Sequence, residues 1–470
     1  MHSTSASPTN RLTIASCLGR MFSAVTSAMQ PARIPLALLA VLLIGALTPV
    51  VDLAGGKAYG PRGFASGPLS DTELELAYQR AHSATSRLAS DELQALEESL
   101  RGNDATHSAG RRASLSELAG LVRDATAKKV AEREASGSSN DELELKRLRQ
   151  RASEAMLVID EAAPKGVATT FLSGERSAVR QAVNAIVKLD PEALLTSTLG
   201  AVFTLPIAAV RETPLVFPLA LAVALCGISL LAGAVCRMAA VHAGRGGRLS
   251  PFEGSAFARA RALNLVALPI LPTILIALFA LVVLAFVALL RVPVLNVVSG
   301  LLFVVPLLVA LLGAVLAVTA VLSFPLMPAA IAVEDCDAGD AITRAAALAL
   351  ARPLLWIALL ATSLVVLVIG GLIVASVLGL ASGTVSAMLA AIGGEAGRAL
   401  ASGDASDIAA LFGPDRLVGM LVGFWRALLD SVLAAYLFSL ACDLATRAYL
   451  MMREQIDGEN PATIAGYGIR

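Results

Sequence analysis

The sequence predicts an all-α protein: a polytopic bundle of about six transmembrane helices with an extracytoplasmic helical insert. Of its 470 residues, 56% are hydrophobic and only 16% are charged, and the mean hydropathy of +0.72 lies far above that of a soluble domain. More than half of the charged residues fall in 52–213, whereas 266–333 contains Arg291 as its single charge. The chain therefore joins a polar insert to an apolar body.

The apolar body divides into segments long enough to cross a bilayer, which takes about 20 apolar residues of helix. We predict six spans, at 34–51, 215–236, 266–290, 294–322, 354–381 and 428–450. The first could instead be the hydrophobic region of a signal peptide. Because 33 residues precede it and no clean cleavage site follows, we interpret it as a retained transmembrane helix.

Arginines near the span ends set the expected orientation, since cytoplasmic loops carry an excess of Lys and Arg. The N-terminal tail 1–33 contains arginines and no acidic residue, and the loop after the second span contains five arginines against Glu253 alone. Both belong in the cytoplasm. The insert 52–192 then falls outside, and the five-helix domain 214–452 ends in a cytoplasmic tail, 453–470.

The polar insert 52–192 has the pattern of charged, amphipathic helices separated by Gly- and Ser-rich breaks. It is either a surface that binds a protein partner or a second copy, or a solvated spacer. The apolar run that follows, within 193–213, would place the arginine-rich loop outside if it crossed the membrane. We therefore predict an interfacial or re-entrant helix there, with Pro206 and Pro214 near its end.

Three stretches of the membrane half carry a family resemblance. They are "LLAGAVCRMAAVHAGRGGRLSPFEGSAFARARALNL" (230–265), "PLMPAAIAVEDCDAGDAITRAAALALARPLLW" (325–356) and "YLMMREQIDGEN" (449–460). Residues 193–460 resemble a family of uncharacterised bacterial multi-pass membrane proteins with "GGAI-x-R-x-A", "P-x-AIA-x-E…DA-x-x-R…RP" and "YLLLR" motifs. There is also a weak similarity to the membrane domains attached to some glycerophosphodiester phosphodiesterases. The resemblance implies a location in the bacterial inner membrane and this topology, and it lends no activity.

Four carboxylates between two apolar runs form the first candidate site: Glu334, Asp335, Asp337 and Asp340. A calcium loop is disfavoured, because the glycine falls at position five where an EF-hand needs it at position six, and position twelve is Ala346. A proton or ion path at Glu334 is the functional alternative.

A helix start is the interpretation we favour for this segment. The side chain of Asp337 is expected to cap the helix, with Asp340 in its first turn favouring the positive end of the helix dipole. The helix would end before Pro353, and its short apolar face (Ile342, Ala345, Ala346 and Ala349) would lie at the membrane interface. Arg344 would reach toward lipid headgroups or toward Glu334.

The second candidate is Asp443 with Arg447, four residues apart on the last span, where one helix face would hold both. An ion pair and a transport residue are the two interpretations. The five cysteines and four histidines are scattered, so we expect no metal site, no cofactor and no catalytic residues.

These observations favour a non-catalytic structural or scaffolding component of the cell envelope over an enzyme. A transporter or permease for a small solute or ion is the alternative, suggested by prolines within the predicted spans. The expected partners are the lipid bilayer and a protein bound through 52–192. Lys plus Arg and Asp plus Glu are equal at 37 each, so nucleic acid is not expected.

Overall fold

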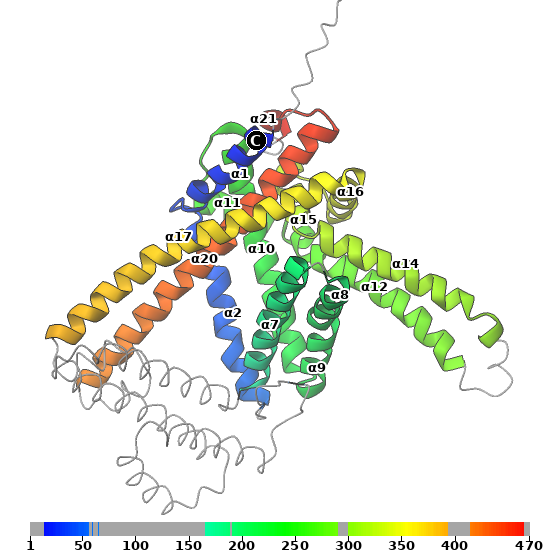
Figure 1. The fold of residues 1–470 in the computed structure, drawn as a ribbon, viewed down its shortest axis with the longest axis horizontal. Coiled ribbons are helices and arrows are strands. Elements are labelled where there is room, and N and C mark those ends of the chain that lie inside the picture. The colour runs from blue at the N-terminus through cyan, green and yellow to red at the C-terminus, as the bar shows by residue number, and fades with distance from the viewer. Residues whose placement is uncertain are drawn as a thin grey trace, which may run out of the picture. The chain divides into compact units, whose positions relative to one another are not determined.

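A computed structural model confirms the all-α multi-pass class (Figure 1). It describes residues 14–55, 59, 64, 165–188, 190–289, 299–392 and 414–464. Within these ranges no strand occurs, and Tyr59 and Lys165 form one isolated antiparallel bridge. Six described helices are long and apolar enough to cross a membrane: α2 (Ile34–Gly55), α10 (Val216–Arg245), α12 (Ala262–Leu289), α14 (Val304–Ser323), α17 (Pro353–Ile392) and α20 (Pro414–Ile456).

The remaining helices are shorter. They are α1 (Ile14–Ala28), α7 (Val167–Lys188), α8 (Pro191–Leu199), the π-helical η2 (Gly200–Thr204), α9 (Leu205–Glu212), α11 (Pro251–Ala260), α15 (Leu326–Glu334), α16 (Ala338–Ala351) and α21 (Pro461–Ile464). Helix α1 lies in the segment expected to be a tail, 1–33. Most of the predicted insert, including both of its charged amphipathic stretches, lies outside the described residues.

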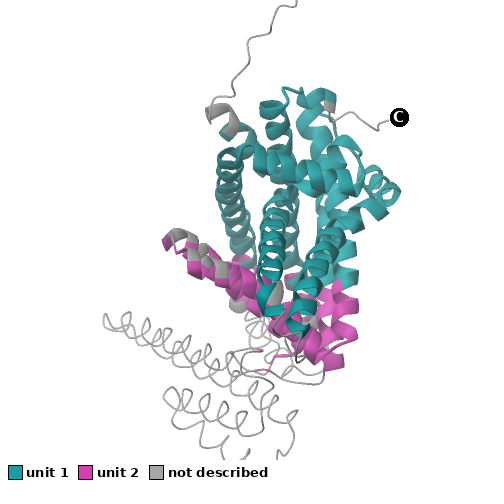
Figure 2. Ribbon diagram, turned by 90° about the vertical axis from the view of Figure 1, so that its right-hand side faces the viewer, with its two compact units in different colours: residues 1–44, 222–382, 427–470 teal, residues 45–221, 383–426 magenta. Residues whose placement is uncertain are grey.

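The chain divides into two compact units (Figure 2). The first comprises residues 1–44, 222–382 and 427–470, and the second comprises 45–221 and 383–426.

Burial in the first unit is concentrated in one part, which we call the head. The head consists of α1, α11, α15, α16 and parts of three long helices, residues 234–245, 353–374 and 435–456. Side chains from these segments form a single apolar core, in which every residue from Ala329 to Val333 is fully buried. The head is therefore packed like the interior of a soluble domain.

Helices α12 and α14 pack on each other and leave the head together (Figure 1). Their apolar side chains are exposed on the remaining faces, with Leu278 55% and Leu311 61% exposed. Apolar surface on this scale fits contact with lipid, because a helix that is hydrophobic all round is either buried in protein or in a membrane. We call this pair the α12–α14 leg.

Prolines and one left-handed residue shape the path through the head. The chain breaks at Phe324 and Pro325 between α14 and α15, and Trp356 Nε1 donates to the Leu322 carbonyl at 3.1 Å, close to the break. Asp335 ends α15 with φ of 56°, a conformation that Asp tolerates better than most side chains. Pro353 then begins α17 directly after α16.

The second unit contains a small core at the end of α2. Asp52 there accepts hydrogen bonds from the backbone N–H groups of Ala168 (2.6 Å) and Thr169 (3.2 Å), so a residue distant in sequence caps α7. A β-carbon added to Gly166 would lie 2.4 Å from the Asp52 side chain, which explains the glycine.

The apolar run predicted within 193–213 forms α8, η2 and α9, which pack against α7. The π-helical turn separates the two short helices, so the run is not one of the six candidate spans found in the described residues. Its interfacial placement stays a prediction.

Candidate functional site

The first site is a buried ion cluster around Asp443, in the half of α20 that belongs to the head. The carboxylate accepts from Arg33 Nη1 at 2.7 Å, from Arg447 Nε at 2.7 Å and from Ser27 Oγ at 2.6 Å. The side chains of Arg33 and Asp443 are fully buried. We call these four residues the Asp443 cluster.

Two guanidinium groups and one carboxylate leave the Asp443 cluster with one net positive charge. Backbone carbonyls and a hydroxyl offset it: Arg33 Nη2 donates to the Met238 carbonyl at 3.3 Å, and Arg447 Nη1 donates to the Arg20 carbonyl at 2.9 Å and to Ser23 Oγ at 2.8 Å. These contacts join α1, the residue before α2, α10 and α20. Buried ion pairs contribute little stability over apolar packing, but they fix which helix faces meet.

Sequence reasoning found the pair of Asp443 and Arg447 but missed Arg33 and Ser27. Arg33 lies 410 residues from Asp443 and had been counted only as a cytoplasmic charge near a span. No local pattern could reveal it, because an acid with an arginine four residues away already has a partner.

The second site surrounds Glu334, the last residue of α15. The hydroxyl of Tyr449 and Nη1 of Arg344 donate to its two carboxylate oxygens, and Arg453 Nε lies 2.9 Å from Oε1 as an ion pair without hydrogen-bond geometry. We call Glu334, Arg344, Tyr449 and Arg453 the Glu334 cluster. Burial alone would lower the pKa of Arg344, but the charge of Glu334 outweighs it and raises that pKa.

The predicted cap at the start of α16 is wrong in its chemistry. Asp337 occupies the N-cap position, but its side chain makes no capping hydrogen bond. Its carboxylate instead lies 3.4 Å from Asn264 Nδ2, which draws the oxygen away from the helix backbone. Asp340 lies in the first turn as expected, is exposed, and is 3.8 Å from Arg344.

Asp335, which the sequence left without a role, forms the stronger contact of this segment. Its two oxygens accept from Arg261 Nε at 2.7 Å and Nη2 at 2.8 Å, a bidentate pair that fastens the end of α15 to the start of α12. The hydrogen bond to Asp335 raises the pKa of Arg261.

The apolar face of α16 packs against protein rather than lying free at the interface. Ala345 and Ala349 are buried in the head core, and α16 contacts α12, α14 and α15. Small side chains allow this close approach of helices, which a pattern of alternating apolar residues does not distinguish from a lipid-facing surface.

A further arginine is used inside the head. Arg237 is buried, donates from Nη1 to the Ala332 carbonyl at 2.7 Å, and stacks over the Phe257 ring at 5.0 Å. It thus places a cation at the C-terminal end of α15, the negative end of the helix dipole. The sequence indicated it only as one charge of an arginine-rich loop.

The chemistry of both clusters is ion pairing between helices. Among the described residues, no group of three or more His, Cys, Asp or Glu side chains could hold a metal ion. The carboxylates of Glu334 and Asp443 are each held by three donors of the same chain.

The fold and these clusters define a polytopic helical membrane protein whose deepest charges are paired within a packed head. Comparison with protein-family models, with curated proteins and with solved structures gives no match. The family resemblance of residues 193–460 stays a prediction.

Proposed function

We propose that the protein is a non-catalytic structural or scaffolding component of the cell envelope, placed in the bacterial inner membrane with both termini in the cytoplasm. One observation carries the proposal. The two carboxylates best placed to serve an ion or proton path, Glu334 and Asp443, are each held by three donors of the same chain.

A carboxylate that passes an ion or proton across a membrane must exchange partners during each cycle. Removing one partner from a buried ion pair costs about 3–5 kcal/mol, so the Asp443 cluster resists such exchange. The α12–α14 leg offers no replacement, because neither of its helices contains an Asp, Glu, Lys or Arg residue. Paired charges on immobile helices suit a scaffold that holds a fixed shape.

A transporter for a small solute or ion is the second candidate, and one observation favours it. Helix α15 is a short helix between breaks, as in the discontinuous helices that line transport sites. Arg237, however, occupies the end of α15 through the Ala332 carbonyl, where a solute would need to bind. This contact supports the scaffold over the transporter.

Flux through purified protein in sealed liposomes distinguishes the two candidates. We expect wild-type liposomes to pass no more protons, ions or small polar solutes than empty ones. The variants Glu334→Gln and Asp443→Asn test the two carboxylates, and Asp340→Asn, on the exposed face of α16, is the matched control. Flux in the wild type that either variant abolishes and the control retains would replace the scaffold with the transporter.

The scaffold also requires a partner. We propose that it binds through the insert 52–192, either a second copy of this chain or another envelope protein. Cross-linking in cells should capture one specific species with the wild type and lose it when 66–160 is deleted. A deletion variant that inserts normally and keeps the same cross-linked species would contradict binding through the insert.

A further inference from the structure

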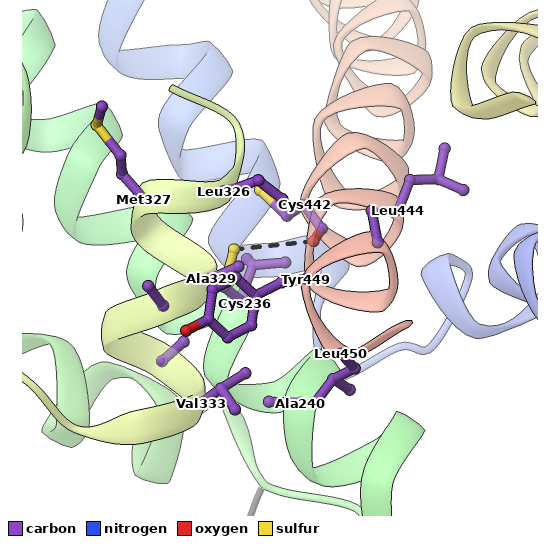
Figure 3. Packing of buried hydrophobic residues seen from close by; sticks show 14 of the residues in the cluster. Cys236, Ala240, Leu326, Met327, Ala329, Val333, Cys442, Leu444, Tyr449 and Leu450 are labelled. Atoms are coloured by element: carbon purple, nitrogen blue, oxygen red, sulfur yellow. Dashed lines mark hydrogen bonds between the residues drawn. The ribbon is translucent and has the colours of Figure 1, made fainter. Parts of the chain in front are cut away.

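Two cysteines from different helices meet in the core of the head. The thiol of Cys236, on α10, donates to the backbone carbonyl of Cys442, on α20, at 3.8 Å. The thiol of Cys442 lies within hydrogen-bonding reach of the Cys236 thiol as well. Figure 3 shows the pair among the apolar side chains of both helices and α15.

The contact is short because the surrounding side chains are small or flat. Ala239 and Ala240 follow Cys236 on α10 and are fully buried, so the two helices approach closely at this level. Thr446 donates to the same Cys442 carbonyl at 2.8 Å, which holds that part of α20 in place. Neither thiol has to leave the helix–helix contact to reach the other.

We propose that Cys236 and Cys442 are a disulfide-forming pair that covalently fastens α10 to α20 in the head. A disulfide needs the two α-carbons within about 7 Å, a separation that close helix packing at small residues permits. The next residue after Cys442 is Asp443, so the bond would lock the helix that carries the Asp443 cluster. This inference concerns the head alone and does not rest on the proposed function.

The oxidant is an apolar two-electron acceptor of the quinone class. Cys236 is 2% exposed and Cys442 8% exposed, so an acceptor that dissolves in the bilayer reaches them more readily than a charged one. Both S–H bonds break and one S–S bond forms. The two electrons and two protons pass to the quinone, which becomes a hydroquinone.

The other cysteines provide internal references. Cys226 and Cys336 are half-buried, and neither has a thiol partner in the part of the chain that the structure describes. A general tendency to oxidise would act on these more exposed thiols first. A built pair instead predicts selective oxidation of Cys236 with Cys442.

Mass spectrometry of the full-length protein in detergent tests the pair. The folded protein is treated with a short-chain quinone, or with copper phenanthroline as a stronger oxidant. Free thiols are then blocked with N-ethylmaleimide in denaturant, and the chain is digested without reductant. We expect a peptide pair that joins Cys236 to Cys442, with hydroquinone formed in equal amount, and its loss on reduction.

Two variants complete the test. Cys226→Ser should keep the cross-linked peptide pair, whereas Cys442→Ala should lose it without transferring the bond to another cysteine. Absence of the pair with both oxidants would overturn the site, as would a preferred bond to Cys226 or Cys336. A bond formed with copper phenanthroline but never with the quinone would overturn the class of oxidant.

Discussion

Replacing Asp443 with alanine is expected to destabilise the head by about 3–5 kcal/mol, the cost of leaving a buried charge without its partner. The size follows from the geometry. The carboxylate accepts three hydrogen bonds of 2.6–2.7 Å, and the Arg33 side chain that would lose its counterion is fully buried. Solvent cannot screen a guanidinium in this position, so the discount that applies to surface ion pairs is absent.

The two tryptophans allow the head to be followed by itself. Trp356 is 2% exposed within the head core, whereas Trp425 is 62% exposed on the first half of α20. In a Trp425→Phe background, the emission of Trp356 reports unfolding of the head in detergent. Denaturant titration then gives the free energy of unfolding for each variant.

Coupling within the cluster provides the sharper comparison. The double variant Asp443→Ala/Arg447→Ala should cost less than the sum of the single variants by about 1–3 kcal/mol, because the second change removes a cation that the first left unpaired. Asp430→Ala is the matched control, since it removes an exposed acid from the same helix and should change stability by less than about 0.5 kcal/mol. Additive single effects, or an Asp443→Ala cost no larger than the control, would refute a paired cluster.

Three further outcomes follow from the other contacts. Asp335→Ala should cost about 1 kcal/mol through loss of its partly exposed pair with Arg261, and Asp337→Ala less than about 0.5 kcal/mol; denaturant titration with the reverse order would restore side-chain capping by Asp337. Asp52→Ala should lower the unfolding free energy of its unit by about 1 kcal/mol, because α7 loses its cap, and unchanged hydrogen exchange at the start of α7 would contradict this. Burial raises the pKa of the Cys336 thiol to about 11, so in a variant with this single cysteine the iodoacetamide rate should still rise steeply above pH 9.5; a plateau near pH 9 would show an unperturbed thiol.

The fold class was predictable because it depends on composition over long windows. A bilayer span needs about 20 apolar residues, and every predicted span overlaps one of the six candidate helices. The head was not predictable in the same way. Hydropathy is equally high for residues that face lipid and for residues that pack on protein, so the buried run Ala329–Val333 and the exposed α12–α14 leg have similar sequences.

The candidate sites were predictable only where the partners are close in sequence. Asp443 with Arg447 and Asp340 with Arg344 are four residues apart, and helical geometry alone brings each pair together. Contacts such as Arg33 with Asp443 depend on tertiary packing. No spacing rule encodes them, and an arginine near a span reads the same whether it faces headgroups or a buried acid.

A head on the cytoplasmic side of six spans is the claim on which the other expectations rest. Fusions of alkaline phosphatase, which is active only outside the cytoplasm, test it at two positions. We expect no activity for a fusion after residue 250, in the arginine-rich segment of the head, and strong activity for a fusion after residue 400, between α17 and α20. Activity after 250 together with silence after 400 would invert the molecule and contradict a cytoplasmic head.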